Sequence, residues 1–199
     1  MGIDFKNSQT KINLIRSFAG ESQARNRYVY SAEQAKKSGL YVVEMAFKFT
    51  ASQEEAHGKV FYDFLKDQSG TKIEMDGSYP VDNYDDVLKL LRAAQNNELE
   101  EFSPVYPAFA KIANEEGFNQ IGAKFSEIAK IEETHSKRFE QLADWIEQGK
   151  LFVSDVQTQW MCLNCGYVHT STEAPKACPV CGHNQGYFVR LEFAPYTKG

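Results

Sequence analysis

Four stretches of the chain place apolar residues at one repeated spacing. Between Ile121 and Ile146 they recur at alternating steps of four and three residues, which is the spacing of a helix face buried in a bundle. The same spacing occurs within residues 14–35, 43–64 and 87–112. The pattern therefore predicts four long helices that pack together through these faces.

Charged or polar residues interrupt each of these faces near its middle. Two faces carry Glu-x-x-His and a third carries Glu-x-x-Glu, and a step of three residues puts both side chains on one side of a helix. A carboxylate in a bundle core costs several kcal/mol or more unless a partner compensates its charge, and a metal ion is a natural partner. The residues are Glu21 in the first helix, Glu54 and His57 in the second, Glu98 and Glu101 in the third, and Glu132 and His135 in the fourth.

Buried salt bridges are the alternative to a metal site. Arg25 is the basic residue found on these four faces, and one cation cannot neutralise five carboxylates. The pattern therefore favours a di-metal site, and oxygen-rich ligation with two imidazoles suits iron or manganese better than zinc or copper. Tyr28, one step beyond Arg25, is either a core aromatic residue or a hydrogen-bond donor to a ligand carboxylate.

Capping and breaking residues set the expected helix boundaries. Pro104 and Pro107 predict that the third helix kinks or restarts just after Glu101. Acidic residues at 82, 85 and 86 are typical of a cap and a first helical turn. We expect helices from an N-cap at Ser8 to Lys37, from Leu40 to Gln68, from about Asp82 to Gly117, and from there to Gln148.

The link between the second and third helices, residues 70–82, is too long for a tight turn. Extended, these residues reach about 43 Å at roughly 3.3 Å each. The helix arms beyond His57 and before Glu98 add up to about 40 Å, at 1.5 Å per residue. We therefore prefer a crossover that runs back along the bundle, and a long hairpin loop remains the alternative.

Composition changes after Gly149, where helical spacing stops. The residues Cys162, Cys165, Cys178 and Cys181 form two Cys-x-x-Cys-Gly motifs separated by 12 residues. A glycine after the second cysteine permits the left-handed turn that wraps backbone N–H groups towards sulfur. Four thiolates suit zinc or iron equally. We expect a helical domain over residues 1–149 and a small β-rich metal domain over residues 150–199, in which His169 and His183 lie at the surface.

Charge and hydropathy narrow the classes of function. The net charge of −5 gives no basic patch for nucleic acid. No window resembles a signal peptide or an apolar span of 18 residues. We therefore expect a soluble, cytoplasmic protein without nucleic-acid or membrane partners.

Together these motifs make the chain resemble the rubrerythrin family. The match covers nearly the whole chain and rests on Glu21, on Glu54-Glu55-Ala56-His57, on Glu98-Leu99-Glu100-Glu101 followed by Tyr106-Pro107, on Glu132-Glu133-Thr134-His135 and on the four cysteines. The resemblance implies a ferritin-like four-helix di-iron bundle with one long crossover, followed by a rubredoxin-like domain in which the four cysteines hold one iron.

The resemblance also implies an activity, the reduction of hydrogen peroxide to water. Electrons would come from NAD(P)H through a separate reductase or a rubredoxin, and the protein would be a homodimer or a higher homo-oligomer. One subunit's rubredoxin-like domain would then approach the other subunit's di-iron site. By motif, Glu54 and Glu132 would bridge the irons, Glu21, Glu98 and His135 would be terminal ligands, Glu101 and His57 would alternate at one iron, and Tyr28 and Tyr106 would support the ligands.

Two other readings of the same residues remain open. A ferritin-like ferroxidase or iron-handling protein would need the helical site but no electron relay, which the cysteine domain argues against. A binding module would use a structural zinc ribbon to recognise a partner. For His57 the alternative to exchange with Glu101 is a fixed hydrogen-bond donor behind the ligands.

Overall fold

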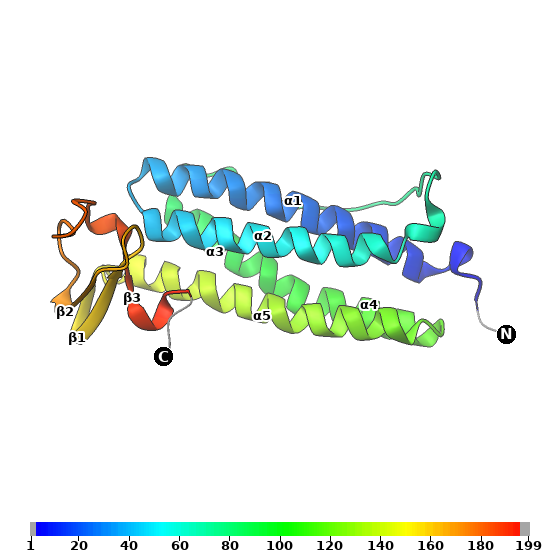
Figure 1. Cartoon of the computed structure of the whole chain (residues 1–199). Coiled ribbons are helices and arrows are strands. Elements are labelled where there is room, and N and C mark those ends of the chain that lie inside the picture. Colours follow the sequence, from blue (N-terminus) through cyan, green and yellow to red (C-terminus); the bar gives the residue numbers. More distant parts are fainter. Residues whose placement is uncertain (1–2, 196–199) are drawn as a thin grey trace.

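The computed structural model describes residues 3–195, which form a long helical bundle with a small sheet at one end (Figure 1). Among these residues, no helix is long and apolar enough to cross a membrane. The helical part matches the predicted all-α bundle, with its third helix in two pieces. The helices are α1 (Gln9–Lys37), α2 (Tyr41–Asp63), α3 (Val87–Glu100), α4 (Tyr106–Glu115) and α5 (Asn119–Glu147).

The first helix has the predicted boundaries. The Ser8 side chain accepts a hydrogen bond from the Lys11 backbone N–H and so caps α1, which satisfies one of the free N–H groups at a helix start. The second helix is shorter than predicted: α2 ends at Asp63, and a 3₁₀ turn, Lys66–Gln68, follows it. The third helix begins later than predicted, because Asp86 is its N-cap and accepts from the Lys89 N–H.

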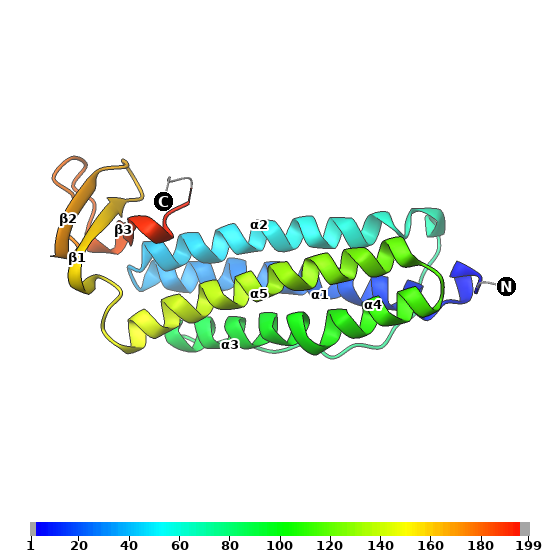
Figure 2. The same ribbon diagram turned by 90° about the horizontal axis from the view of Figure 1, so that it is seen from below.

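The connection between α2 and α3 is a crossover, as preferred from the sequence. It leaves the far end of α2 and returns along the outside of the bundle to the start of α3 (Figure 2). Arg27 binds Asp82 at 2.8 Å, and Asn97 donates to the same carboxylate. Asp82, predicted at the start of the third helix, instead fastens the crossover to α1 through Arg27 and to α3 through Asn97. Gln34 fastens the end of the crossover by donating to the Asp85 carbonyl.

The third bundle helix is interrupted where the prolines predict. A π-helical turn, Glu101–Val105, joins α3 to α4, and Ser103 within it has a non-helical backbone. Pro104 has no N–H to give to the ladder of helical hydrogen bonds, which forces the interruption. Such π-turns are frequent at functional sites, and this one begins at Glu101.

The core of the bundle is divided into two aromatic clusters. One cluster surrounds Phe47, Phe139 and Tyr28, and the other surrounds Phe61, Phe125 and Tyr106. The side chains of all six residues are at most 2% exposed. The polar mid-face residues lie between the clusters, so apolar packing holds the helices together on both sides of the bundle centre.

The C-terminal part is a three-stranded antiparallel sheet of β1 (Val153–Cys162), β2 (Val168–Glu173) and β3 (Phe188–Arg190) in the order β2-β1-β3. This agrees with the predicted β-rich fold. Trp160 and Phe188 are fully buried and pack with Cys162 and Cys178. So small a core depends on additional staples such as a metal site.

The sheet packs against the end of the bundle at the turn between α1 and α2. The rings of Tyr41 and Tyr187 stack at 4.0 Å between centroids. A Cβ atom on Gly186 would lie 1.9 Å from the Gly39 carbonyl oxygen, so the two backbones touch where only glycine fits. The Arg190 guanidinium lies over the rings of Trp145 and Trp160, at 4.4 Å and 5.4 Å. These contacts join residues of the bundle to residues of the sheet.

The change Gly186→Ala should separate the sheet from the bundle. The added methyl group meets a backbone oxygen, which cannot rotate away, and overpacking of this kind costs about 1–3 kcal/mol. Hydrogen exchange should become faster at the start of α2, while the rest of the bundle keeps its protection. Gln157→Ala, on an exposed position of β1, is the control. Unchanged exchange around Gly39 in the Gly186 variant would contradict the contact.

Candidate metal centres

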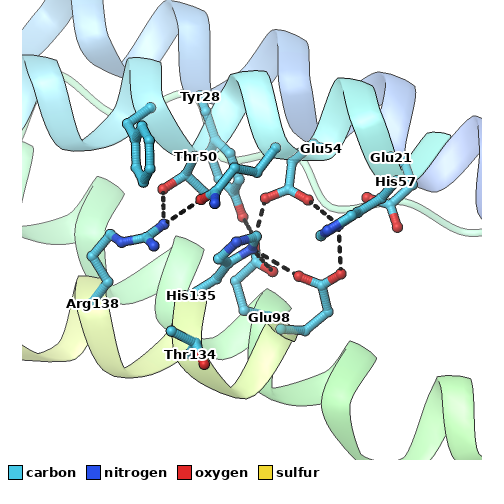
Figure 3. Close-up of polar contacts among 12 residues, drawn as sticks. Glu21, Tyr28, Thr50, Glu54, His57, Glu98, Thr134, His135 and Arg138 are labelled. Carbon is cyan, nitrogen blue, oxygen red and sulfur yellow. Dashed lines mark hydrogen bonds and ion pairs between the residues drawn. The ribbon is translucent and has the colours of Figure 1, made fainter. Parts of the chain in front are cut away.

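Six of the predicted mid-face residues converge at the centre of the bundle, and all six are buried (Figure 3). Their ligand atoms form two groups, and within each group every atom lies within 4.8 Å of the others. Glu54 and Glu132 belong to both groups. Two adjacent ion positions that share two carboxylates are therefore built into the fold. The groups are Glu21, Glu54, His57 and Glu132, and Glu54, Glu98, Glu132 and His135.

The two shared carboxylates each face both imidazoles. His135 Nδ1 lies 2.9 Å from Glu54 Oε1 and 2.8 Å from Glu132 Oε2. His57 Nδ1 lies 3.1 Å from Glu54 Oε2 and 2.9 Å from Glu132 Oε1. Each carboxylate thus presents one oxygen to each histidine, as two bridging carboxylates do between two ions.

The donor atoms fit metal ions better than they fit one another. Several are fully buried without a hydrogen-bond partner of acceptable geometry, although carboxylate oxygens crowd around His135 Nδ1. Buried polar atoms are nearly always hydrogen-bonded, so a cluster of unsatisfied ones calls for a cation. These atoms are Glu21 Oε2, Glu54 Oε1, Glu98 Oε2, both Oε atoms of Glu132, and Nδ1 and Nε2 of His135.

Two tyrosines hold the carboxylates that are not shared. The Tyr28 hydroxyl donates to Glu98 Oε1 and the Tyr106 hydroxyl donates to Glu21 Oε1. Tyr28 is thus both a core aromatic residue and a hydrogen-bond donor to a carboxylate of the site. Each hydrogen bond uses one carboxylate oxygen and leaves the other, Oε2, facing the centre. The tyrosines therefore orient Glu21 and Glu98.

Glu101 lies apart from both groups of ligand atoms. It occupies the first position of the π-turn and is only partly buried. Its carboxylate lines a cavity beside α1, close enough to Glu21 that its negative charge adds to burial in raising the pKa of Glu21. The structure therefore brings six of the seven predicted helical ligands together and places the seventh beside them.

Arg138, and not the expected Arg25, is the arginine whose side chain lies next to the ligand residues. Arg25 points to the surface, where its Nε lies 3.2 Å from Glu55. The prediction that Arg25 lies on the buried face was therefore wrong. Arg138 Nη1 instead donates to Thr50 Oγ1 at 2.8 Å and to Gln53 Oε1 at 3.0 Å, next to the ligands (Figure 3). Burial lowers the pKa of Arg138, and the charges of the glutamates oppose this. Arg138 follows His135 by three residues but lies off the four-three pattern, which is why that pattern missed it.

The pKa values show that the metal-free cluster holds protons. Burial, assisted by the charge of Glu54, raises the pKa of Glu98 to about 8. Burial opposes the protonation of His135, but its contacts with Glu132, Glu54 and Glu98 outweigh this and raise its pKa to about 12. Burial also raises the pKa of Glu101. A metal ion that binds here displaces these protons.

The four cysteines converge in the sheet domain. Cys162 and Cys181 have their sulfurs 3.7 Å apart, and Cys165 and Cys178 have theirs 3.6 Å apart. The edge of a tetrahedron with metal–sulfur bonds near 2.3 Å is about 3.8 Å, whereas a disulfide needs about 2.0 Å. The arrangement therefore fits one ion bound by four thiolates.

The backbone around the cysteines has the predicted turns. Gly166 and Gly182 have φ of 78° and 74°, the left-handed region that favours glycine. Backbone N–H groups point at the sulfurs: that of His183 lowers the pKa of Cys181, to about 6, despite burial. His169 and His183 are partly exposed, and neither belongs to the four-cysteine cluster; the His183 ring packs edge-on against Tyr187.

Comparison with known proteins settles the family. A rubrerythrin family model matches residues 13–143 and 89–159, and a model for the rubredoxin-like domain of rubrerythrin matches residues 160–189. The rubrerythrin of Clostridium perfringens is 45% identical over 184 residues, which cover 92% of this chain and 94% of that one. The chain belongs to the rubrerythrin family.

Other relatives and solved structures agree with this assignment. The rubrerythrin of Porphyromonas gingivalis is 44% identical over 96% of this chain and 94% of its own. A structure of nigerythrin in its fully reduced, all-ferrous state has a TM-score of 0.62 and 26% identity, covering 92% of this chain and 90% of that one. A Desulfovibrio desulfuricans bacterioferritin shares the fold, with a TM-score of 0.63 at 18% identity over 71% of this chain and 82% of that one.

Rubrerythrins are oxidoreductases, and this chain carries their two kinds of metal site. The residues of a di-iron carboxylate site lie in the ferritin-like bundle, and those of a four-cysteine iron site lie in the rubredoxin-like part. The bundle residues fit two iron ions because two carboxylates belong to both ligand groups. The cysteines fit one iron ion because their sulfurs have the spacing of a tetrahedral metal site.

Removing the metal should make the stability of this rubrerythrin fall as the pH rises from 6 to 8. Glu98 and His135 have folded-state pKa values raised to about 8 and about 12, from 4.5 and 6.5. The folded apo-protein then binds more protons than the unfolded chain, so deprotonation lowers its free energy of unfolding, by up to about 1.4 kcal/mol per pH unit for each group.

The metal-loaded protein is the control, because its ligands have already lost their protons, and its stability should vary less with pH. Urea unfolding of both forms at several pH values measures the difference. An apo-protein that became more stable between pH 6 and pH 8 would contradict the proton-holding cluster.

Proposed function

We propose that this protein is a non-haem di-iron peroxidase that reduces hydrogen peroxide to water. The reaction consumes one peroxide, two protons and two electrons and yields two molecules of water. The observation that carries the proposal is the pair of ligand groups that share Glu54 and Glu132, because it places two ions side by side. The four-cysteine site on the same chain supplies the second argument, since a redox enzyme needs a source of electrons.

Bound iron would supply the redox chemistry: two ferrous ions would hold the two electrons needed to cleave one O–O bond, and an iron in the four-cysteine site would be a one-electron source for them. The protein fixes the ions and their surroundings. In our proposal Glu54 and Glu132 would be shared by both ions, Glu21 would belong to one ion position, and Glu98 and His135 would belong to the other. Tyr28 and Tyr106 keep Glu98 and Glu21 in place through their hydrogen bonds.

We further propose that His57 and Glu101 alternate as ligands to one ion. In this structure His57 lies within the ligand group and Glu101 lies outside it. An anionic carboxylate suits harder ferric iron, whereas a neutral imidazole suits ferrous iron. In our proposal His57 would therefore be the ligand to ferrous iron and Glu101 the ligand to ferric iron. Glu101, which lines the cavity, would also deliver a proton to the substrate.

We propose two domains, and each has its own role in the reaction. Residues 1–149 carry the peroxide chemistry, and residues 150–199 relay electrons. The electrons come from NAD(P)H through a reductase or a rubredoxin, and the protein acts as a homodimer or a higher homo-oligomer. We place it in the cytoplasm.

The two sites should be separable by mutation. Cys178→Ser should abolish the red colour of a four-thiolate ferric site and the turnover driven by NADH and a reductase. The pre-reduced bundle should still consume about one peroxide per di-iron site, since its two electrons are already in place. Visible absorption and stopped-flow peroxide consumption measure these two results.

Loss of that single turnover in a folded, iron-loaded bundle would contradict the relay. A wild type with colourless zinc in the four-cysteine site and no peroxide turnover would instead support the iron-handling alternative. Metal analysis of the same preparation distinguishes these outcomes.

The exchange of ligands should be visible in crystals. Oxidised and reduced forms in one crystal form should show an ion bound by Glu101 in the first and by His57 in the second. Glu101→Gln, which removes the anionic donor but keeps its size, should leave His57 bound in both states. Contact with Glu101 and not with His57 in both states of the wild type would refute the exchange.

A further inference from the structure

A cavity of about 560 Å³ lies beside the di-iron centre, on the side of the crossover. It lies between α1, the crossover and the π-turn, and two residues of the site line it: Glu101, and Tyr106, whose hydroxyl donates to Glu21. Two other cavities, beside Arg138 and beside Pro107, have none of the seven helical ligand residues in their walls. Of these three cavities, the one at the crossover has one of those seven residues, Glu101, in its wall.

One face of α1 forms the inner wall of this cavity, and Gly20 lies at its middle, directly before Glu21. A Cβ atom on Gly20 would lie 3.9 Å from Tyr79 Cε1 and 4.0 Å from Glu101 Oε1. It would therefore occupy the gap between these two side chains. Both distances are ordinary van der Waals contacts, so alanine fits without displacing anything.

Helix stability does not explain this glycine. Glycine inside a helix destabilises it by about 0.5–1 kcal/mol relative to alanine. Gly58 has a packing reason, since its Cβ would lie 3.3 Å from Glu21 Cβ where α1 and α2 meet. Gly20 has no such close neighbour, so what it provides is the open space itself.

The crossover forms the outer wall of the cavity and is bonded to α1. The Tyr79 hydroxyl donates to the Arg16 carbonyl at 3.2 Å. On either side of Tyr79 the crossover is tied to α1 by ion pairs, Arg16 with Asp76 and Arg27 with Asp82. Each arginine is thus paired with an aspartate, and the lining residues carry more acidic groups (Asp76, Glu100 and Glu101) than basic ones (Arg16 and Arg27). Such a passage suits a small uncharged molecule better than an anion.

We propose that this cavity is the route by which small uncharged oxidants reach the di-iron site, and that Gly20 keeps it open between Tyr79 and Glu101. Gly20 and Tyr79 are positioning residues, which act on access and not on the chemistry. The identity of the oxidant as hydrogen peroxide rests on the proposed function, whereas the route does not. Nitric oxide, a small uncharged ligand of ferrous iron, can therefore probe the route without peroxide.

The test measures the rate at which nitric oxide binds the fully reduced protein, by stopped-flow absorbance at equal iron content. Gly20→Ala should melt at a temperature equal to or above that of the wild type, yet bind nitric oxide more slowly. Gly20→Leu should slow binding further, at least severalfold, and Tyr79→Ala should make it faster. Ala19→Leu, on the same helix but outside the three cavities, is the matched control and should bind at the wild-type rate.

A purely structural role for Gly20 predicts another pattern, in which Gly20→Ala changes stability alone. Wild-type binding rates in an iron-loaded Gly20→Leu protein would overturn the proposal. If that variant fails to load iron, the nitric oxide binding rates of Gly20→Ala and Tyr79→Ala decide the question. Wild-type rates in both variants would overturn the proposal. A wild type that binds nitric oxide but does not reduce peroxide would refute the peroxidase function and leave the route intact.

Discussion

The structure depends on the repulsion among carboxylates buried at the centre of the bundle. Glu21, Glu54, Glu98 and Glu132 are each at most 1% exposed, and so many negative charges cannot be buried together without compensation. Part of this charge is compensated by two imidazoles, two tyrosine hydroxyls and, at the edge, the Arg138 guanidinium. These groups remain insufficient, as the unsatisfied oxygens show, and metal ions complete the balance.

The rest of the fold follows from keeping this cluster in place. Aromatic clusters on both sides of it supply the apolar burial that the centre lacks. The crossover must connect distant ends of the bundle, and in doing so it forms a wall of the cavity opposite Gly20 of α1. Glu101, the first residue of the π-turn, lies outside the ligand groups and lines the cavity. A connection and an irregular helical turn thereby become walls of the same passage.

Sequence patterns predicted the parts of this molecule that depend on spacing along one helix. The four-three spacing located the mid-face glutamates and histidines, and the prolines at 104 and 107 located the interruption of the third helix. Spacing could not place Arg25 and Arg138, because the outward or inward direction of a long side chain depends on its neighbours across the helix interface. It also misplaced Asp82, whose partners Arg27 and Asn97 are set by tertiary contacts. The cavity beside Glu101 could not be predicted, because three separate segments build it.

The sharing of Glu54 and Glu132 has a consequence for how the halves of the bundle cooperate. The hairpin of α1 and α2 supplies Glu21, Glu54 and His57, and the segment from α3 to α5 supplies Glu98, Glu132 and His135. Each ion position thus takes three ligands from one half and borrows a single carboxylate from the other. The two halves therefore contribute ligands in the same way, and each gives one carboxylate to the ion position of the other. An ion in either position would use a carboxylate that the neighbouring position also uses, so the ions would link the two halves of the bundle at its centre.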